Sequence, residues 1–91
     1  MATIILTLKI MPSDPKVNLD FIADKAEKLI TKFGGKPGKR EKEPIAFGLV
    51  ALKLIFIMDE QKGSTQSLED DIAKMSGVSS VDVIDVRRAI G

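Results

Sequence analysis

The chain has 91 residues, which is enough for one small domain and too few for two separate hydrophobic cores. Hydrophobic residues make up 44% of the chain, as in ordinary globular proteins, so we expect a packed core. The 14 basic and 13 acidic residues leave a formal charge of +1, which gives no argument for a nucleic-acid or acidic-membrane partner. Cysteine and histidine are absent, which excludes common zinc sites, thiol chemistry and histidine general bases. Composition therefore predicts a non-catalytic protein of the reducing cytoplasm, without a metal or another cofactor.

A strand and a helix are the first predicted elements. Residues from Thr3 to Met11 alternate with the period of two that is typical of a strand with one face on a core. Two prolines end this strand, and we expect Asn18 to cap the helix that follows. The glycine pair 34–35 ends the helix. Apolar residues recur along it at spacings of three and four, namely Leu19, Ile22, Ala26, Leu29, Ile30 and Phe33.

The middle of the chain predicts an edge strand, a bend and a central strand. Lys36 to Glu43 contains no aliphatic residue and is predicted to be a loop that passes into a solvated edge strand. From Leu49 to Met58, aliphatic residues occupy both parities, which is typical of a central strand covered at least partly on both faces. Gly48 lies between these stretches, and we expect it to form the bend of a hairpin. The apolar run is too short to span a bilayer, so no membrane association is expected.

A second, shorter helix follows a polar turn at 59–63. Either Ser64 or Thr65 is expected to cap this helix, and Gly77 is expected to end it. Its apolar anchors are Leu68, Ile72 and Met75. These few anchors predict a helix with one narrow apolar stripe on the core.

Residues 78–86 form the last predicted strand, and they complete the fold. The apolar positions change parity between Val83 and Ile84, which predicts either a bulge or a loss of one-sided burial at that point. The element order is therefore β-α-β-β-α-β, the α+β arrangement of the ferredoxin-like sandwich. In this fold two helices cover one face of a four-stranded antiparallel sheet whose first and third strands are central. We expect the whole chain, 1–91, to form this single domain.

Basic residues are concentrated between positions 25 and 42, where seven stand against two acidic residues. The glycine-rich part does not match a phosphate loop, because that motif needs glycine at Phe33 and Ser or Thr at Arg40. This basic stretch is either a solvated face or a surface that steers an RNA or an acidic protein. The candidate steering residues are Lys36, Lys39, Arg40 and Lys42.

RNA binding on this fold needs aromatic residues on the central strands to stack on bases. The chain has no Trp or Tyr and four Phe, of which only Phe56 is well placed on a central strand. A direct nucleic-acid partner is therefore not expected. A small RNA- or ligand-binding module stays as the alternative function.

The segment Pro44-Ile45-Ala46-Phe47-Gly48 is the most unusual part of the sequence. Phe47 directly precedes the predicted bend and follows a proline that interrupts regular pairing at the edge. At the tip of a hairpin this aromatic side chain would be an anchor for a pocket in a protein partner. The alternative is that Phe47 folds inward onto the core. We take the exposed anchor as the hypothesis to test.

The segment 43–52, EPIAFGLVAL, resembles the signature of archaeal translation elongation factor one beta. The resemblance covers the whole chain and includes Met11-Pro12, the helix entry at 63–65, Gly77-Val78 and the ending 83–90. It implies the ferredoxin-like fold and a guanine-nucleotide exchange factor for elongation factor one alpha, the GTPase that carries aminoacyl-tRNA. Such a factor acts by binding the nucleotide-free GTPase more tightly than the nucleotide-bound form, and it binds no nucleotide itself.

The resemblance also assigns roles to individual residues. In the eukaryotic relatives, the phenylalanine of the matching P-I-G-F-G segment inserts into a pocket of the GTPase. The resemblance gives this role to Phe47, surrounded by Pro44, Ile45, Ala46 and Gly48. Those relatives also end in a lysine that disturbs the magnesium and phosphate site. This chain departs from them and has the sequence Arg87-Arg88-Ala89-Ile90-Gly91, so either Arg87 or Arg88 is the candidate for that role.

Overall fold

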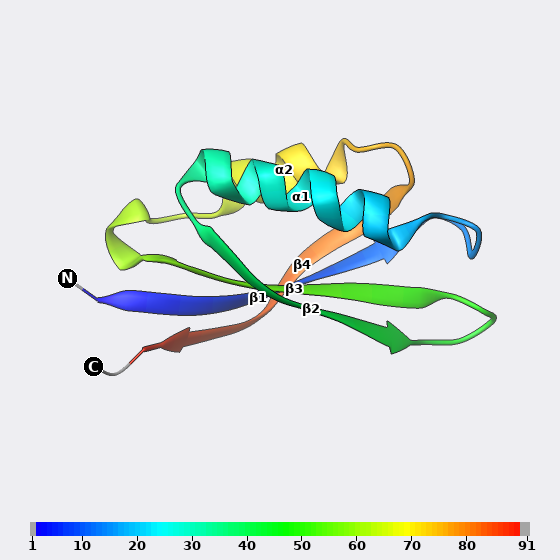
Figure 1. Ribbon diagram of the computed structural model, residues 1–91, viewed down its shortest axis with the longest axis horizontal. Helices are drawn as coiled ribbons and strands as arrows, with labels where there is room; N and C mark the ends of the chain where they lie inside the picture. The colour runs from blue at the N-terminus through cyan, green and yellow to red at the C-terminus, as the bar shows by residue number, and fades with distance from the viewer. Residues whose placement is uncertain (1, 90–91) are drawn as a thin grey trace.

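The computed structural model describes residues 2–89 and has the predicted order of strands and helices. Figure 1 shows a four-stranded sheet with both helices on one of its faces. Every neighbouring pair of strands is antiparallel, in the order β2-β3-β1-β4, so the first and third strands are central as predicted. The elements are β1 (Thr3–Pro12), α1 (Leu19–Phe33), β2 (Lys36–Pro44), β3 (Val50–Asp59), α2 (Gln66–Ala73) and β4 (Val78–Arg88).

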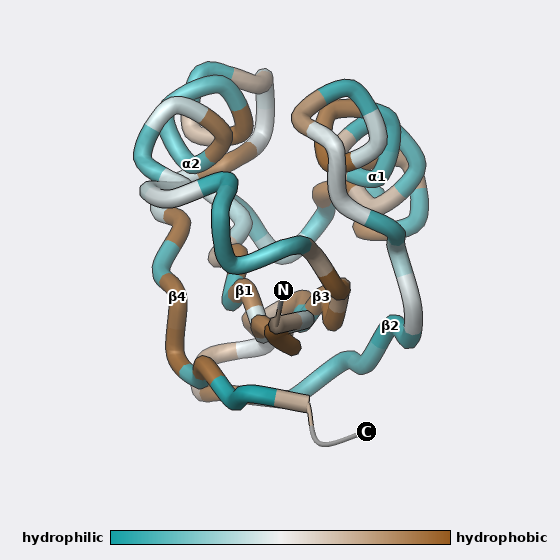
Figure 2. Tube along the Cα trace, turned by 90° about the vertical axis from the view of Figure 1, so that its left-hand side faces the viewer, coloured by the Kyte–Doolittle hydropathy of each residue, from teal (hydrophilic) through white to brown (hydrophobic). Residues whose placement is uncertain are grey.

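The hydrophobic core lies between the sheet and the two helices, which Figure 2 shows side by side above the strands. The two central strands contribute one alternating set of buried side chains, as their sequence pattern predicts. The other face of β3 is partly covered, since Ala51 is buried while Ile57 is exposed. The buried apolar residues of the core are Leu6, Leu8, Ile10, Ile22, Ala23, Ala26, Ile30, Leu52, Leu54, Phe56, Met58, Leu68 and Ile72.

Both predicted ends of α1 are confirmed. The side-chain oxygen of Asn18 accepts a hydrogen bond from the backbone amide of Phe21 at 3.1 Å. Gly34 follows the helix in the left-handed conformation, with a φ of 111°. These caps define the direction in which the chain leaves α1 and enters β2.

The predicted loop at the start of the 36–43 stretch is wrong, because β2 begins directly at Lys36. An edge strand that is exposed along its length needs no aliphatic residues, so the usual pattern of a strand is missing there. The pairing with β3 is interrupted between Pro37 and Arg40. A β-carbon at Gly38 would lie 3.0 Å from the carbonyl oxygen of Ile55, so this position of the strand favours glycine over larger residues.

The second half of the chain holds one correction and one confirmed prediction. The helix α2 ends at Ala73, four residues before the predicted Gly77, which instead has a φ of 90° in the following turn. In the pairing of β1 with β4, Thr7 lies opposite Asp85 and Leu8 lies opposite Val83. Ile84 therefore has no partner residue on β1, which confirms the predicted bulge.

The polar turn at 59–63 contains a short 3₁₀ helix, Glu60–Lys62. Before α2, the hydroxyl of Ser64 accepts a hydrogen bond from the amide of Gln66 at 3.1 Å. The side chain of Thr65 makes no such capping bond. Between residues 2 and 89, no helix combines the length and the hydrophobicity that a membrane span requires.

Candidate functional site

The connection between β2 and β3 is a tight turn whose two central residues are Phe47 and Gly48. The amide of Leu49 donates a hydrogen bond to the carbonyl oxygen of Ala46 at 3.0 Å, which closes the turn. The φ angles of Phe47 and Gly48 are 56° and 80°. Two positive φ angles are characteristic of a type I′ turn, in which the first position favours Asn, Asp or Gly. Phenylalanine in this conformation costs about 1–2 kcal/mol, because its β-carbon crowds the backbone.

The turn also places Phe47 in solvent. Its side chain is 97% exposed, so Phe47 does not fold inward onto the core. Its neighbours Pro44, Ile45, Ala46 and Gly48 are exposed as well, and together they form an apolar tip on the hairpin. A large aromatic residue that is both exposed and conformationally strained has no stabilising role in the isolated chain, and such strain is concentrated at functional sites.

Ion pairs across three strands hold the base of this hairpin. The carboxylate of Glu43 on β2 accepts a hydrogen bond from Lys53 Nζ on β3 at 2.9 Å. It also lies 3.7 Å from Lys9 Nζ on β1. The hydrogen bond and the positive charge of Lys53 lower the pKa of Glu43, and Lys9 adds to the effect. Sequence analysis missed this contact, because it depends on the register of two strand pairs.

The two arginines of β4 lie at the end of that strand. Arg88 Nη2 lies 2.6 Å from Glu60 Oε2, and Arg87 Nε donates to Asp85 Oδ2 at 2.9 Å. Neighbouring residues of a strand point to opposite faces, so the two arginines do not share one surface. Both candidate arginines lie within the described residues, whereas Ile90 and Gly91 of the same ending lie outside them.

The structure does not bring the hairpin tip and the arginines together. Ile4 lies opposite Arg88, whereas Ile10 lies opposite Leu52 near the hairpin. Figure 1 shows the hairpin at one end of the sheet and the end of β4 at the other. At about 3.3 Å per residue, the two groups are separated by roughly 30 Å. A single partner that contacts both must therefore span most of the 42 Å long axis of the molecule.

Comparison with known proteins decides the family. Residues 5–89 match the model of the EF-1 guanine nucleotide exchange domain. This chain belongs to that family. The chain is similar to three archaeal proteins named elongation factor 1-beta. It is 43% identical over 88 residues to that of Methanobrevibacter smithii, covering 97% of this chain and 98% of the relative.

The other two relatives are nearly as completely covered. Identity is 38% over 89 residues with Staphylothermus marinus, covering 97% of this chain and 98% of the relative. It is 34% over 89 residues with Methanocaldococcus jannaschii, covering 98% and 100%. A solved structure, the C-terminal domain of the MgtC protein from Mycobacterium tuberculosis, covers 97% of this chain and 88% of that chain with a TM-score of 0.63. At 10% identity it shows a shared fold alone.

The candidate steering residues of this exchange domain stand along β2, and three of the four lie near carboxylates. Arg40 donates to both carboxylate oxygens of Glu27 at 2.9 and 2.8 Å, and to Asp24 at 2.6 Å. These hydrogen bonds, chiefly those to Glu27, raise the pKa of Arg40 further above its usual range. The other contacts are Lys42 with Asp20 at 3.2 Å and Lys39 with Glu41 at 3.4 Å.

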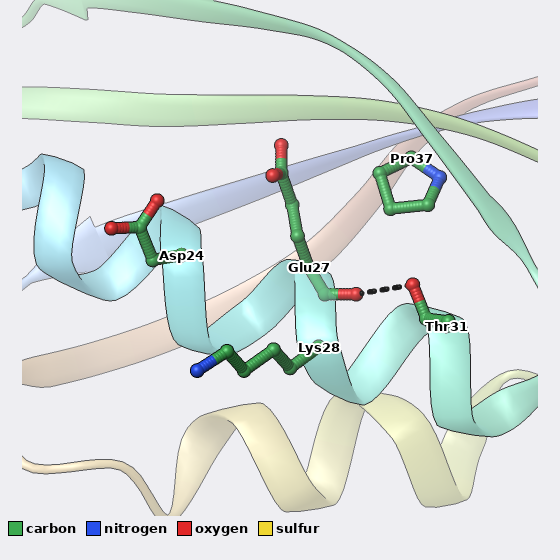
Figure 3. Close-up of a pocket in the computed structure, with 5 residues that line it drawn as sticks. All are labelled: Asp24, Glu27, Lys28, Thr31 and Pro37. Carbon is green, nitrogen blue, oxygen red and sulfur yellow. Dashed lines mark hydrogen bonds between the residues drawn. The ribbon is translucent and has the colours of Figure 1, made fainter.

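The Arg40 contacts place an edge strand against a helix. Figure 3 shows Asp24 and Glu27 projecting from α1 toward the strands, beside a pocket of about 490 Å³. Thr31 donates its hydroxyl hydrogen to the carbonyl oxygen of Glu27 at 3.0 Å, within the same helix. Arg40 therefore binds β2 to α1, which is a structural contact in the isolated chain.

Within residues 2–89, the open face of the sheet carries no aromatic side chain on which a base could stack. Phe56, the one aromatic residue predicted to suit that purpose, is fully buried on the helix side of β3. Of the other phenylalanines, Phe21 and Phe33 belong to α1, and Phe47 is in the hairpin turn. The described strands therefore lack the exposed aromatic residues with which this fold stacks RNA bases.

Proposed function

We propose that this exchange domain promotes GDP release from elongation factor 1-alpha and uses Phe47 as its main anchor. The observation that carries the proposal is the exposed, left-handed conformation of Phe47 at the tip of a well-supported hairpin. The strained conformation lowers the stability of the free chain. It is explained if a partner buries the ring of Phe47 on binding. The family match supplies the class of partner, a translational GTPase.

The mechanism rests on differential binding and needs no bond-making chemistry from the chain. A ligand shifts an equilibrium only by as much as its affinity differs between two states. In the proposal, the pocket for Phe47 is accessible in the nucleotide-free GTPase and closed or distorted when GDP is bound. By linkage, a factor that weakens GDP binding is itself released when nucleotide binds again. The exchange domain then acts without touching GDP or GTP directly.

A second contact is assigned to the other end of the sheet, and of the two candidate arginines we assign it to Arg87, because Arg88 is already paired with Glu60. Cationic side chains there would act on the region that holds magnesium and phosphate, as the resemblance implies. The separation of roughly 30 Å between the two ends makes these independent contacts with distant areas of the GTPase. Binding at both ends restrains the GTPase in one conformation more strongly than either contact alone.

The decisive experiment measures release of a fluorescent GDP analogue from the cognate elongation factor 1-alpha. Phe47→Ala is expected to lower the affinity for the nucleotide-free GTPase by thirty- to a thousand-fold, which corresponds to about 2–4 kcal/mol for the loss of an aromatic anchor. Phe21→Ala is the matched control, because Phe21 is an exposed phenylalanine on α1 and not part of the hairpin. Equal exchange by both variants would contradict the proposal. Micromolar GDP binding by the isolated chain would contradict its indirect mechanism.

A further inference from the structure

The exposed surface of α1 carries two stripes of opposite charge. Positions that differ by three or four residues lie on the same side of a helix. Figure 3 shows that Asp24 and Glu27 project from α1 toward the strands, whereas Lys28 extends along the side of α1 nearer to α2. The acidic stripe consists of Asp20, Asp24 and Glu27, and the basic stripe consists of Lys25, Lys28 and Lys32.

Only the acidic stripe is neutralised. Its carboxylates contact Arg40 and Lys42 of β2 at 2.6–3.2 Å. None of the three lysines of the basic stripe forms an ion pair with another described residue. Lys25 Nζ lies 5.0 Å from the centre of the Phe21 ring, and this cation–π contact does not neutralise the charge of Lys25. The charges therefore separate across the helix, and the net positive charge faces α2.

A groove of about 610 Å³ runs between α1 and α2 beside the basic stripe. Figure 2 shows the two helices side by side above the sheet. The helix α2 adds Asp71, and Lys74 directly follows this helix, so four lysines and one aspartate line the groove. Its apolar lining is Leu29 and Met75, which are partly buried and pack against the core. An apolar floor between cationic walls is thus present on the helix layer, on elements other than the hairpin and β4.

We propose that this groove docks an acidic amphipathic segment of a protein partner, in addition to the GTPase contact of the hairpin. The cationic walls specify acidic side chains along the flanks of the segment, and the Leu29–Met75 floor requires an apolar stripe between those flanks. Lys25 and Lys32 are separated by about 10 Å along the helix axis, so the groove matches a segment of roughly two to three helical turns. A nucleic-acid backbone would use the lysines and leave the apolar floor without a role.

The test uses fluorescence anisotropy with the full chain and three labelled probes. The first probe is a peptide of about 15 residues with leucines at helical i, i+4 spacing and glutamates elsewhere, and the second is the same composition in scrambled order. The third is a uridine oligonucleotide of similar charge. The protein variant is Lys25→Gln/Lys28→Gln/Lys32→Gln. Its control, Lys16→Gln/Lys36→Gln/Lys62→Gln, loses the same charge at exposed positions that do not line the groove.

The amphipathic peptide is expected to bind more tightly than the scrambled one, and to bind about tenfold more weakly to the groove variant than to its control. Melting curves of both variants establish that they are folded, and GDP release by the groove variant stays within about twofold of the parent, which separates this site from the hairpin anchor. Equal binding of the two peptides, or equal losses in the two variants, would overturn the proposal. Tighter binding of the oligonucleotide at the same lysines would replace the peptide with nucleic acid as the occupant.

Discussion

Phe47 and Gly48 share the two central positions of one turn, and both have positive φ angles, 56° and 80°. Glycine adopts this conformation freely, whereas phenylalanine is destabilised there by about 1–2 kcal/mol. Within residues 2–89, Phe47 is the only residue other than glycine with a positive φ. The hairpin is therefore less stable than it would be with a residue that favours this conformation at position 47. The same conformation holds the ring of Phe47 almost entirely in solvent.

Replacing Phe47 by asparagine should stabilise the domain and inactivate it at once. Asparagine tolerates the left-handed conformation and is favoured at this position of a type I′ turn. We expect the free energy of unfolding of Phe47→Asn to rise by about 0.5–1.5 kcal/mol, which raises the Tm by about 2–10 °C in a domain of this size. Exchange activity should fall as far as in Phe47→Ala. Thermal melts and GDP release measured on the same samples test both halves.

Two further variants calibrate that result. Alanine, unlike asparagine, is not favoured in the left-handed conformation, so Phe47→Ala keeps the strain of the turn. It should change the free energy of unfolding by only about 0.5 kcal/mol, as surface substitutions usually do. Phe56→Ala removes a fully buried ring and should lose about 3–5 kcal/mol. A Phe47→Asn variant that melts well below the parent would show that the ring stabilises the isolated chain, and the anchor hypothesis would lose its main support.

The fold was predictable in those elements where burial of one side produces a periodic pattern of apolar residues in the sequence. The alternation in β1 and the three- and four-residue spacing in α1 both reflect the side that faces the core. The exposed strand β2 carries no such period, so its beginning at Lys36 could not be read from its residues. The end of α2 was misplaced because Gly77 marks a residue with positive φ in the turn, several residues after the helix hydrogen bonds stop.

The candidate site was predictable as a motif and not as a geometry. Residue type alone favours a buried phenylalanine, so the orientation of Phe47 required the turn conformation. The ion pair between Arg40 and Glu27 joins residues 13 positions apart, and it depends on how β2 packs beside α1. Local sequence rules relate residues three or four positions apart, so they cannot predict this ion pair. The sequence therefore indicated a basic stretch without showing which of its charges are neutralised.

Protonation of Glu43 should destabilise the base of the hairpin. The hydrogen bond from Lys53 lowers the pKa of Glu43 in the folded state, so the folded state binds this proton less readily than the unfolded state. The contribution to stability is complete above the usual glutamate pKa of about 4.3, and it is lost as the pH falls through the lower folded value. Urea unfolding of the parent and of Glu43→Gln should therefore differ most near neutral pH and converge in acid. A difference that grows in acid would contradict this assignment.

The basic residues of β2 should separate into steering and structural positions. Lys36 and Lys39 are exposed, and exposed charges act mainly on association rates. We expect Lys36→Gln/Lys39→Gln to slow association with the GTPase by about two- to threefold at low salt and not at high salt. Arg40→Gln leaves Asp24 and Glu27 without their cation, so its main effect should be a lower Tm. Stopped-flow binding at two salt concentrations tests the first expectation, and an effect confined to dissociation would contradict it.

The two arginines of β4 should differ in what they stabilise. Arg88 contacts Glu60, 28 positions earlier, and so connects the end of β4 to the segment after β3. Arg88→Ala should therefore lower the free energy of unfolding by about 0.5–1 kcal/mol, at the upper end for exposed pairs. Among the described residues, the one ion-pair partner of Arg87 is its near neighbour Asp85 on the same strand, and we expect Arg87 to turn to the GTPase. Arg87→Ala should leave the melt unchanged and reduce GDP release.

The combination of Arg87→Ala with Phe47→Ala tests whether the two ends of the sheet act independently. Substitutions more than about 10 Å apart with no shared contacts usually have additive effects, and these two positions are separated by roughly 30 Å. The loss of affinity for the nucleotide-free GTPase in the double variant should therefore equal the sum of the single losses within about 0.5 kcal/mol. Arg88→Ala with Phe47→Ala is the matched control, with little loss beyond that of Phe47→Ala. A double variant no weaker than Phe47→Ala alone would mean that the arginine contact forms only after the anchor has docked.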